Sequence, residues 1–172
     1  MLPAHGRDIT PQPPSDVGGC LFLRPPVTRF WCDIRHCYSG LMKTATEALE
    51  QFFAAINRND LAAITDDFDP QIVRIEPDGF PTAGIYRGIS EVHEHVKKGR
   101  GTWAEGTCEP EKYLVNGDKV VVYLHARVRL KSSGEWVGGR FADGFVFRDG
   151  KIIEYRSFGE RAQALEWANI TD

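Results

Sequence analysis

The sequence of 172 residues contains no apolar run that approaches the roughly 20 residues needed for a transmembrane helix. It also lacks an excess of basic charge, because 21 Lys and Arg residues against 24 Asp and Glu residues give a formal net charge of -3. Phosphate binding requires a basic surface, so this balance argues against nucleic acid as a partner. No internal repeat is evident, and the proline-rich beginning is the only biased segment.

Cysteine is scarce as well, with only Cys20, Cys32, Cys37 and Cys108 in the chain. Cys32, His36 and Cys37 lie close together, but no CxxC pair or second cluster completes a zinc-like spacing. We therefore expect no metal site, and the residues suggest no cofactor. Nothing indicates a disulfide framework, so a reducing cytoplasm is the expected location.

Hydrophobic residues make up 42% of the chain, which is enough for one ordinary domain with a packed core. Residues 1–41 differ from the rest, because "PQPP" and "RPP" interrupt helices and central strands and no periodic apolar pattern occurs. We interpret 1–41 as a flexible extension and 42–170 as the domain. Met42 is a candidate for the native start, which would make the extension an artefact of gene assignment. Detection of residues 1–41 by mass spectrometry of the native N-terminus would contradict that interpretation.

Ordered patterning begins at Thr44, which forms a capping-box signature with Glu47 ahead of a helix with apolar spacing. A second, short helix follows Asn59 or Asp60, and a short strand over 71–76 ends at Pro77. The remaining expected elements are a loop over 77–84, a helix over 88–99, four strands over 103–115, 119–130, 136–148 and 151–158, and a terminal helix over 159–168.

Helices that come first and hairpin-linked strands that come later indicate an α+β fold rather than a parallel, doubly wound sheet. Three N-terminal helices can cover one face of a curved, mostly antiparallel sheet. This arrangement predicts a conical barrel with an apolar interior that suits a small apolar ligand.

One strand of this sheet places an acid on its apolar face. Phe141, Phe145 and Phe147 alternate as strand neighbours should, and Asp143 falls on the same face. A carboxylate in an apolar setting is costly unless it is paired, hydrogen-bonded or protonated, and burial raises its pKa. Asp143 is therefore a candidate functional acid. Two alternatives stay open: pairing with Arg140 or Arg156, or an outward-facing Phe face in a dimer interface.

Several segments resemble the nuclear transport factor 2-like superfamily, in its SnoaL-like and ketosteroid-isomerase-like branch. They are "ALEQFFAAINRNDLAAITDDF", "IEPDG", "YRG" and "DGFVFRDGKIIEYRSFGE", within about residues 43–168. The resemblance implies a conical α+β barrel, open at one end, that usually dimerises through the outer face of its sheet.

The resemblance also suggests roles for single positions. Glu76, just before Pro77, matches the proton-shuttling base of ketosteroid isomerases. Asp143 matches both their donor to the enolate oxygen and the acid/base aspartate of SnoaL-like cyclases. Phe52 stands where the isomerases have a tyrosine, which argues against steroid isomerisation. Ser157 and Arg129 stand where epoxide hydrolases of this fold would need acids, which argues against that reaction.

These observations predict a cofactor-free isomerase or cyclase that moves a proton on a small, apolar, carbonyl-bearing molecule. Glu76 would be the base, Asp143 the acid or hydrogen-bond donor, and Tyr155 a further oxygen-orienting group, although Tyr155 also suits a core position. The alternatives are a non-catalytic binding protein for a hydrophobic ligand and a dimerisation module. The residues expected to shape the pocket are Phe52, His95, Val122, Leu124, Ala126, Phe141, Phe145 and Ser157.

Overall fold

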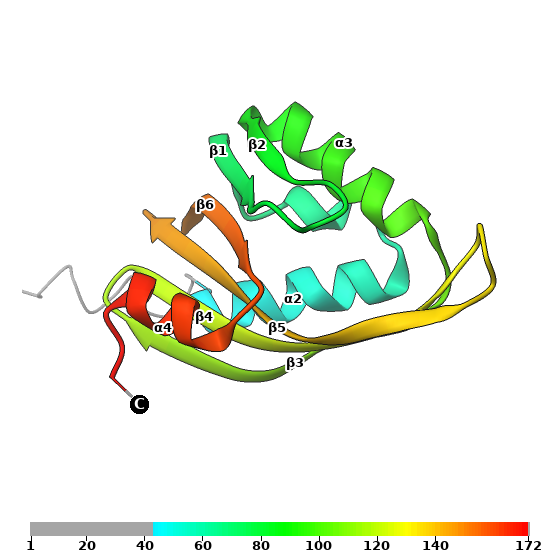
Figure 1. Cartoon of the computed structure of the whole chain (residues 1–172). Coiled ribbons are helices and arrows are strands. Elements are labelled where there is room, and N and C mark those ends of the chain that lie inside the picture. Colours follow the sequence, from blue (N-terminus) through cyan, green and yellow to red (C-terminus); the bar gives the residue numbers. More distant parts are fainter. Residues whose placement is uncertain (1–42, 172) are drawn as a thin grey trace, which may run out of the picture.

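The computed structural model describes residues 43–171, in which helices and one 3₁₀ turn surround a six-stranded sheet (Figure 1). The expectations for residues 1–41, including the exclusion of a metal site at Cys32, His36 and Cys37, lie outside the described residues. In chain order the elements are α2 (Ala45–Arg58), η1 (Ala63–Thr65), β1 (Phe68–Glu76), β2 (Gly84–Arg87), α3 (Gly88–Gly101), β3 (Trp103–Asn116), β4 (Lys119–Leu130), β5 (Trp136–Arg148), β6 (Lys151–Phe158) and α4 (Arg161–Ala168).

Helix α2 begins with the capping box that the sequence predicts. The Thr44 side chain accepts a hydrogen bond from the Glu47 backbone N–H, and the Glu47 carboxylate accepts one from the Thr44 backbone N–H. The helix ends at Asn59, whose φ of 58° places it in the left-handed region. These two caps fix a helix whose apolar side faces the sheet.

The strands follow the order β2-β1-β6-β5-β4-β3. Only β1 and β6 pair in parallel, and the other neighbours are antiparallel. The sheet curves strongly and does not close, and α2 and α3 lie on its concave side (Figure 1). Gly138 permits this curvature on β5, because a Cβ there would overlap the carbonyl group of Ala126 on β4. The predicted α+β cone is thereby confirmed.

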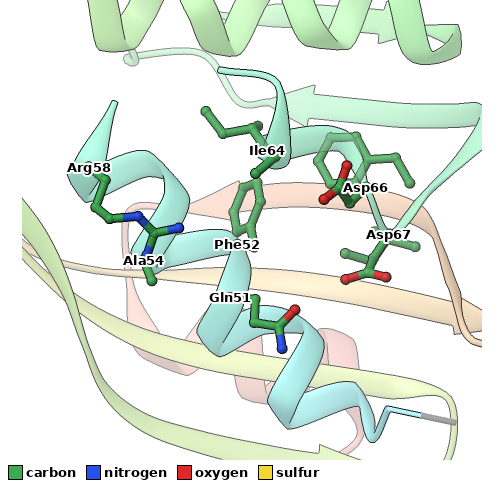
Figure 2. A pocket seen from close by; sticks show the side chains of 10 residues that line it. Gln51, Phe52, Ala54, Arg58, Ile64, Asp66 and Asp67 are labelled. Atoms are coloured by element: carbon green, nitrogen blue, oxygen red, sulfur yellow. The ribbon is translucent and has the colours of Figure 1, made fainter. Parts of the chain in front are cut away.

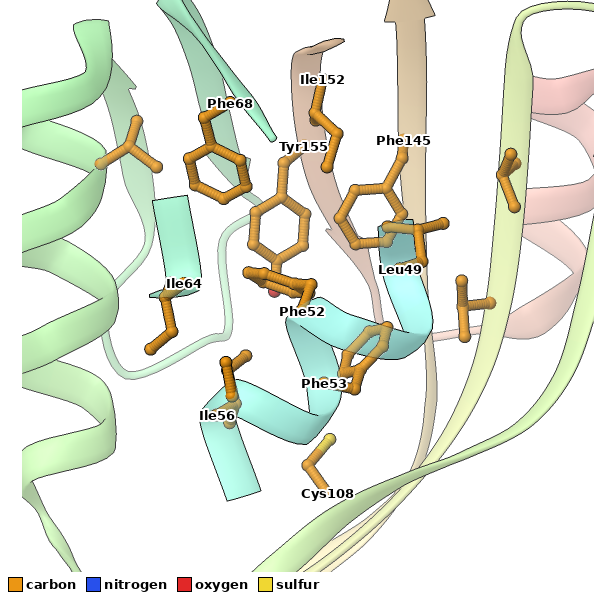
Figure 3. Close-up of a cluster of buried hydrophobic side chains, with 14 of the residues drawn as sticks. Leu49, Phe52, Phe53, Ile56, Ile64, Phe68, Cys108, Phe145, Ile152 and Tyr155 are labelled. Carbon is orange, nitrogen blue, oxygen red and sulfur yellow. The ribbon is translucent and has the colours of Figure 1, made fainter. Parts of the chain in front are cut away.

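The core fills the closed part of the cone between α2 and the sheet (Figure 3). Its aromatic centre is Phe52, whose ring makes edge contacts with Phe53, Phe145 and Tyr155 at centroid distances of 5.1, 5.9 and 5.5 Å. Four side chains that were expected to shape the pocket, Phe52, Val122, Leu124 and Phe145, belong to this core. Their burial removes enough apolar surface from water to hold the helix on the sheet.

The convex side of the sheet is partly covered by α4. Val121 and Tyr123 of β4 form a second buried cluster with Ala164 and Ala168 of α4. The stripe of β4 that includes Arg127 and Arg129 continues beyond this helix, with Arg127 exposed. The outer face is therefore divided between a part covered by α4 and a part that stays open.

Differences from the predicted elements are small and local. The predicted short second helix is only the three-residue 3₁₀ turn η1, and β1 begins soon after it at Phe68. Strand β2 was not predicted, because its four residues Gly84–Arg87 lie between a turn-rich loop and a helix. None of the helices within residues 43–171 combines the length and hydropathy that a membrane span requires.

Candidate active site

The site arises where three neighbouring strands bring their inner faces into register. Strand β6 lies between β1 and β5, with Tyr155 opposite Arg74 on one side and Phe145 on the other. Two residues further along β6, on the same face as Tyr155, Ser157 lies opposite Asp143. Because side chains on one face of adjacent strands stand about 5 Å apart, this pairing gathers residues that are some 80 positions apart in sequence.

Asp143 lies at the bottom of this arrangement, with only 2% of its surface exposed. Its Oδ1 accepts a hydrogen bond of 2.5 Å from the Ser157 hydroxyl, and its Oδ2 accepts one of 2.9 Å from the Tyr155 hydroxyl. Among residues 43–171, no arginine forms an ion pair with Asp143. Arg140 pairs with Glu111 instead, and Arg156 pairs with Glu154. The alternative of direct pairing with Arg140 or Arg156 is therefore wrong.

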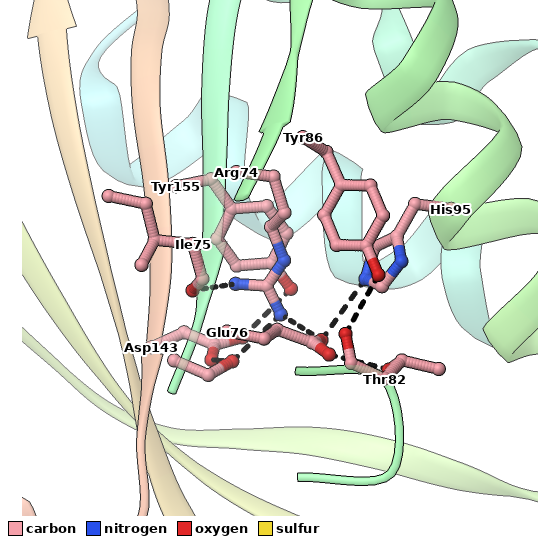
Figure 4. A network of polar contacts seen from close by, with 9 residues as sticks. Arg74, Ile75, Glu76, Thr82, Tyr86, His95, Asp143 and Tyr155 are labelled. Carbon is pink, nitrogen blue, oxygen red and sulfur yellow. Dashed lines mark hydrogen bonds and ion pairs between the residues drawn. The ribbon is translucent and has the colours of Figure 1, made fainter. Parts of the chain in front are cut away.

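Glu76 ends β1 and is held by three groups from three different elements (Figure 4). Its Oε1 accepts a 2.7 Å hydrogen bond from Nη2 of Arg74 and lies 3.2 Å from Nε2 of His95. Its Oε2 accepts a 2.5 Å bond from the Thr82 hydroxyl. Tyr86 supports the set from β2, because its ring stacks on that of His95 with centroids 3.9 Å apart.

Arg74 connects the two acids. Its Nη2 donates to Glu76 and also, over 2.8 Å, to the Ser157 hydroxyl that in turn donates to Asp143. Its guanidinium carbon lies 3.6 Å from the centre of the Tyr155 ring, in cation–π contact. Since Arg74 is 4% exposed, one buried cation serves both carboxyl groups, directly for Glu76 and through a hydroxyl for Asp143.

The environments of the two acids move their pKa values in opposite directions. Desolvation raises the pKa of Asp143 above its ordinary value, although the charge of Arg74 and the hydrogen bonds from Ser157 and Tyr155 oppose the rise. Burial would also raise the pKa of Glu76, but His95, Arg74 and Thr82 outweigh it and lower that pKa to about 2. Glu76 is therefore an anion at neutral pH, whereas burial favours the protonated form of Asp143 more than in an ordinary aspartate.

Both acids line one cavity of about 370 Å³. Its inner wall is polar and buried, and it consists of Arg74, Glu76, His95, Asp143, Tyr155 and Ser157. The rest of the wall is mostly apolar and includes Phe53, Ile56, Cys108, Val128, Leu130 and Phe141. A cavity of this size, with few convergent polar groups in an apolar wall, is typical of small-molecule sites.

The SnoaL-like domain family matches residues 49–155, which run from helix α2 to Tyr155 of β6 and include both acids. The chain belongs to the SnoaL-like domain family. An uncharacterised protein of Mycobacterium tuberculosis is 29% identical over 126 residues, which cover 71% of this chain and 95% of that protein.

Solved structures share the fold of this SnoaL-like domain. An NTF2-like protein of Burkholderia thailandensis is 27% identical, with a TM-score of 0.62 over 76% of this chain and all of that one. A protein of Catenulispora acidiphila with a ketosteroid-isomerase-like fold, solved in complex with trimethylamine, is 12% identical. Its TM-score is 0.60, and the match covers 74% of this chain and 96% of that one.

The SnoaL-like cavity contains some of the expected residues and excludes others. Glu76, Asp143, Tyr155, His95, Phe141 and Ser157 all line it. The other five expected pocket residues do not line it: Phe52, Val122, Leu124, Phe145 and, at the edge of the core, Ala126. The physical reason is that α2 packs onto the middle of β4. The open space therefore starts further along the strand, at Val128 and Leu130.

Two residues of the SnoaL-like site were not foreseen from the sequence. Arg74 alternates with Ile72 and Glu76 on the inner face of β1, so the period-2 rule that selected Asp143 would also have selected it. Thr82 comes from the turn-rich loop after β1, where no periodic signal exists.

A second, smaller cavity of about 210 Å³ lies between α2, η1 and the start of β1 (Figure 2). Phe52 and Ile64 in its wall are buried, whereas Arg58 and Asp66 are exposed. Among residues 43–171, no group of three or more His, Cys, Asp or Glu side chains is placed to hold a metal ion.

Proposed function

We propose that this SnoaL-like protein is a cofactor-free acid–base catalyst, an isomerase or cyclase that moves a proton on a small, largely apolar carbonyl compound. The observation that supports it most strongly is the single cavity lined by both Asp143, with its raised pKa, and the Arg74–Glu76–His95 group. Acids whose pKa values are driven apart within one dry cavity are typical of proton-transfer sites.

In this proposal Asp143 carries the proton. Its carboxylate removes a proton from the carbon next to the substrate carbonyl, and the electron pair moves onto the carbonyl oxygen to form an enolate. The proton then returns at another carbon, which gives an isomer, or the enolate carbon attacks an electrophilic carbon of the same molecule, which closes a ring. Because burial raises the pKa of Asp143, its carboxylate is a stronger base than an ordinary aspartate, and the same group can return the proton.

Glu76 takes a different role from the base that the resemblance suggests. A carboxylate whose pKa is about 2 is a weak base, because Arg74, His95 and Thr82 stabilise its charged form. Glu76 would instead position Arg74 and His95, which line the same cavity and can stabilise the enolate oxygen.

The test is hydrogen exchange, because it needs no knowledge of the product. A panel of enolisable ketones and lactones is incubated with the protein in deuterated buffer, and loss of the proton next to the carbonyl is followed by NMR. We expect the wild type to accelerate exchange for at least one compound and Asp143→Asn to lower that rate by about 10²-fold or more. Asp118→Asn is the matched control, since Asp118 is an exposed acid in the β3–β4 turn. Equal exchange rates for Asp143→Asn and wild type would refute the role of Asp143.

A non-catalytic binding protein remains the second candidate, and the saturated hydrogen bonding of Glu76 favours it. In that case Asp143 would only anchor a polar group of the ligand. The two candidates differ in one result: a binding protein would bind a ketone from the panel without accelerating its exchange. A pure dimerisation module has less support, because side chains leave about 370 Å³ of the cone unfilled.

We further propose that the open part of the outer sheet face forms a homodimer. Trp136 lies there with 48% of its surface exposed, and the side chain of Arg127 covers its ring at 4.6 Å. Light scattering should give twice the chain mass for the wild type, and a monomer mass would contradict the proposal.

A further inference from the structure

The cavity has two ends that differ in charge. Burial separates an inner end, where Asp143, Ser157 and Arg74 are at most 4% exposed, from an outer end where Val137 is 41% exposed. Among residues 43–171, the acids in the cavity wall are Glu76 and Asp143, and both belong to the inner end. The outer end includes Arg100, Thr102, Trp103 and Leu130.

Within the described part of the chain, Arg100 is the one charged side chain at the outer end of the cavity wall. It lies in the last turn of α3 and is only partly exposed. No carboxylate lies within ion-pair distance of its guanidinium among residues 43–171. By contrast, Arg129, Arg140, Arg156 and Arg161 each pair with a nearby glutamate.

The Arg100 side chain is held through its Nε atom and through contact with a tryptophan ring. Its Nε donates a 2.8 Å hydrogen bond to the carbonyl oxygen of Ile56, at the end of α2, and its guanidinium carbon lies 4.8 Å from the centre of the Trp103 ring. The same carbonyl oxygen also accepts a 3.1 Å hydrogen bond from the Asn59 backbone N–H at the C-cap of α2. The two terminal nitrogens of Arg100 take no part in the Nε bond. In a guanidinium group these nitrogens form a fork that can bind a carboxylate through two parallel hydrogen bonds.

The outer end is itself anchored to the sheet. The Lys131 backbone N–H donates to the carbonyl of Thr102 over 2.9 Å, and the Lys131 ammonium donates to the carbonyl of Gly101 over 2.8 Å. These bonds join the end of α3 to the end of β4, so Arg100 and Leu130 are held at one rim. A fixed cation at the rim of an otherwise apolar wall is pre-organised for an anionic group, and binding then costs little ordering.

We propose that the substrate is an apolar carbonyl compound that also bears a carboxylate, and that Arg100 binds this carboxylate while the carbonyl group lies at the Asp143 end. The proposal deepens the proposed function and rests on it for the position of the carbonyl. It makes Arg100 a specificity-determining residue, because only a molecule with its acid and carbonyl at opposite ends fits both charged regions.

The test compares two ligands of nearly the same shape, 4-oxo-4-phenylbutanoate and its primary amide, by calorimetric titration. We expect the wild type to bind the acid about tenfold more tightly than the amide, as a charge-assisted hydrogen bond at a partly exposed site allows. Arg100→Gln should abolish this preference, and Arg100→Lys should retain part of it. The preference should also shrink as the ionic strength rises.

Arg127→Gln is the matched control. Arg127 likewise has no carboxylate within ion-pair distance among the described residues, and it likewise lies over a tryptophan, but it does not line the cavity. It should leave the preference for the acid unchanged. Melting curves of each variant show whether Arg100→Gln loses the fold with the Ile56 bond, in which case Arg100→Lys decides the matter.

Three results would overturn the proposal: wild type that binds neither ligand, wild type that binds both equally, and folded Arg100→Gln that still prefers the acid. All are binding measurements and do not depend on turnover. A preference that depends on Arg100, together with unchanged exchange in Asp143→Asn, would therefore refute the catalytic role and leave the carboxylate site standing.

Discussion

Replacement of Arg74 by methionine breaks the buried ion pair with Glu76, and we expect it to lower the folding stability strongly. Methionine keeps much of the aliphatic volume and removes the charge that faces Glu76 at 2.7 Å. Glu76 is then left as a mostly buried anion, with 10% of its side chain exposed, and loses its principal cation. Removing one partner of a buried ion pair typically costs about 3–5 kcal/mol of folding stability.

A second estimate comes from the pKa of Glu76. It falls from an ordinary value of 4.5 to about 2, and each pH unit corresponds to about 1.4 kcal/mol, so the folded site stabilises the carboxylate by about 3 kcal/mol. This figure is a net effect, because burial opposes it and Arg74 shares the favourable part with His95 and Thr82. Both estimates place the effect of Arg74→Met at a few kcal/mol.

The assay is a double-mutant cycle by urea denaturation at neutral pH. We expect Arg74→Met to be strongly destabilised and Arg74→Met with Glu76→Gln to recover about 2 kcal/mol relative to the sum of the single changes, because the orphaned charge is removed. Arg87→Met is the control, because Arg87 is exposed, and it should change stability by less than about 0.5 kcal/mol. A coupling energy below about 0.5 kcal/mol would refute the view that these two charges form one unit.

The same cycle has a pH-dependent readout. The folded-state pKa of Glu76 is lowered, so its contribution to stability is complete above the unfolded value of 4.5 and is lost as the pH falls toward about 2. Arg74→Met moves the folded-state pKa of Glu76 back toward its ordinary value. The variant should therefore lose less stability than the wild type over this acid range, and an unchanged acid dependence would contradict the assignment.

Three further changes have simple expected outcomes. Tyr155→Phe removes a hydrogen bond that lowers the pKa of Asp143, so the acid limb of the pH–rate profile for exchange should move to higher pH. Gly144→Ala would place a Cβ 2.6 Å from the Trp167 ring, and we expect a loss of about 1–3 kcal/mol with red-shifted tryptophan emission as α4 loosens. Thr44→Ala removes the cap of α2 and should cost about 1 kcal/mol in thermal unfolding.

The elements themselves were largely predictable because their signals are local. Thr44 and Glu47 define a helix start within four residues, and the turn at 116–118 fixes the hairpin between β3 and β4. The short strand β2 carries no such signal, since four residues are too few to show a period. It exists because β1 offers it an edge, which is a tertiary cause.

The site was predictable only in part, for a similar reason. Asp143 and Arg74 can each be selected by alternation along their own strands. Their connection through Ser157 depends on the parallel pairing of β1 with β6, which joins segments about 80 residues apart. The extent of the pocket depends on where α2 stops along β4, and no pattern within either segment sets that point.

The position of β6 between the two acids explains why this site can hold them so close together. Two carboxyl groups that face each other directly in an apolar cavity would compete for one proton. Here the Ser157 hydroxyl accepts a hydrogen bond from Arg74 and donates one to Asp143. The guanidinium of Arg74 therefore pairs directly with Glu76 and is hydrogen-bonded to Asp143 only through Ser157. The fold thus lowers the pKa of Glu76 to about 2, whereas burial raises the pKa of Asp143. The proposed proton transfer depends on this difference between the two acids.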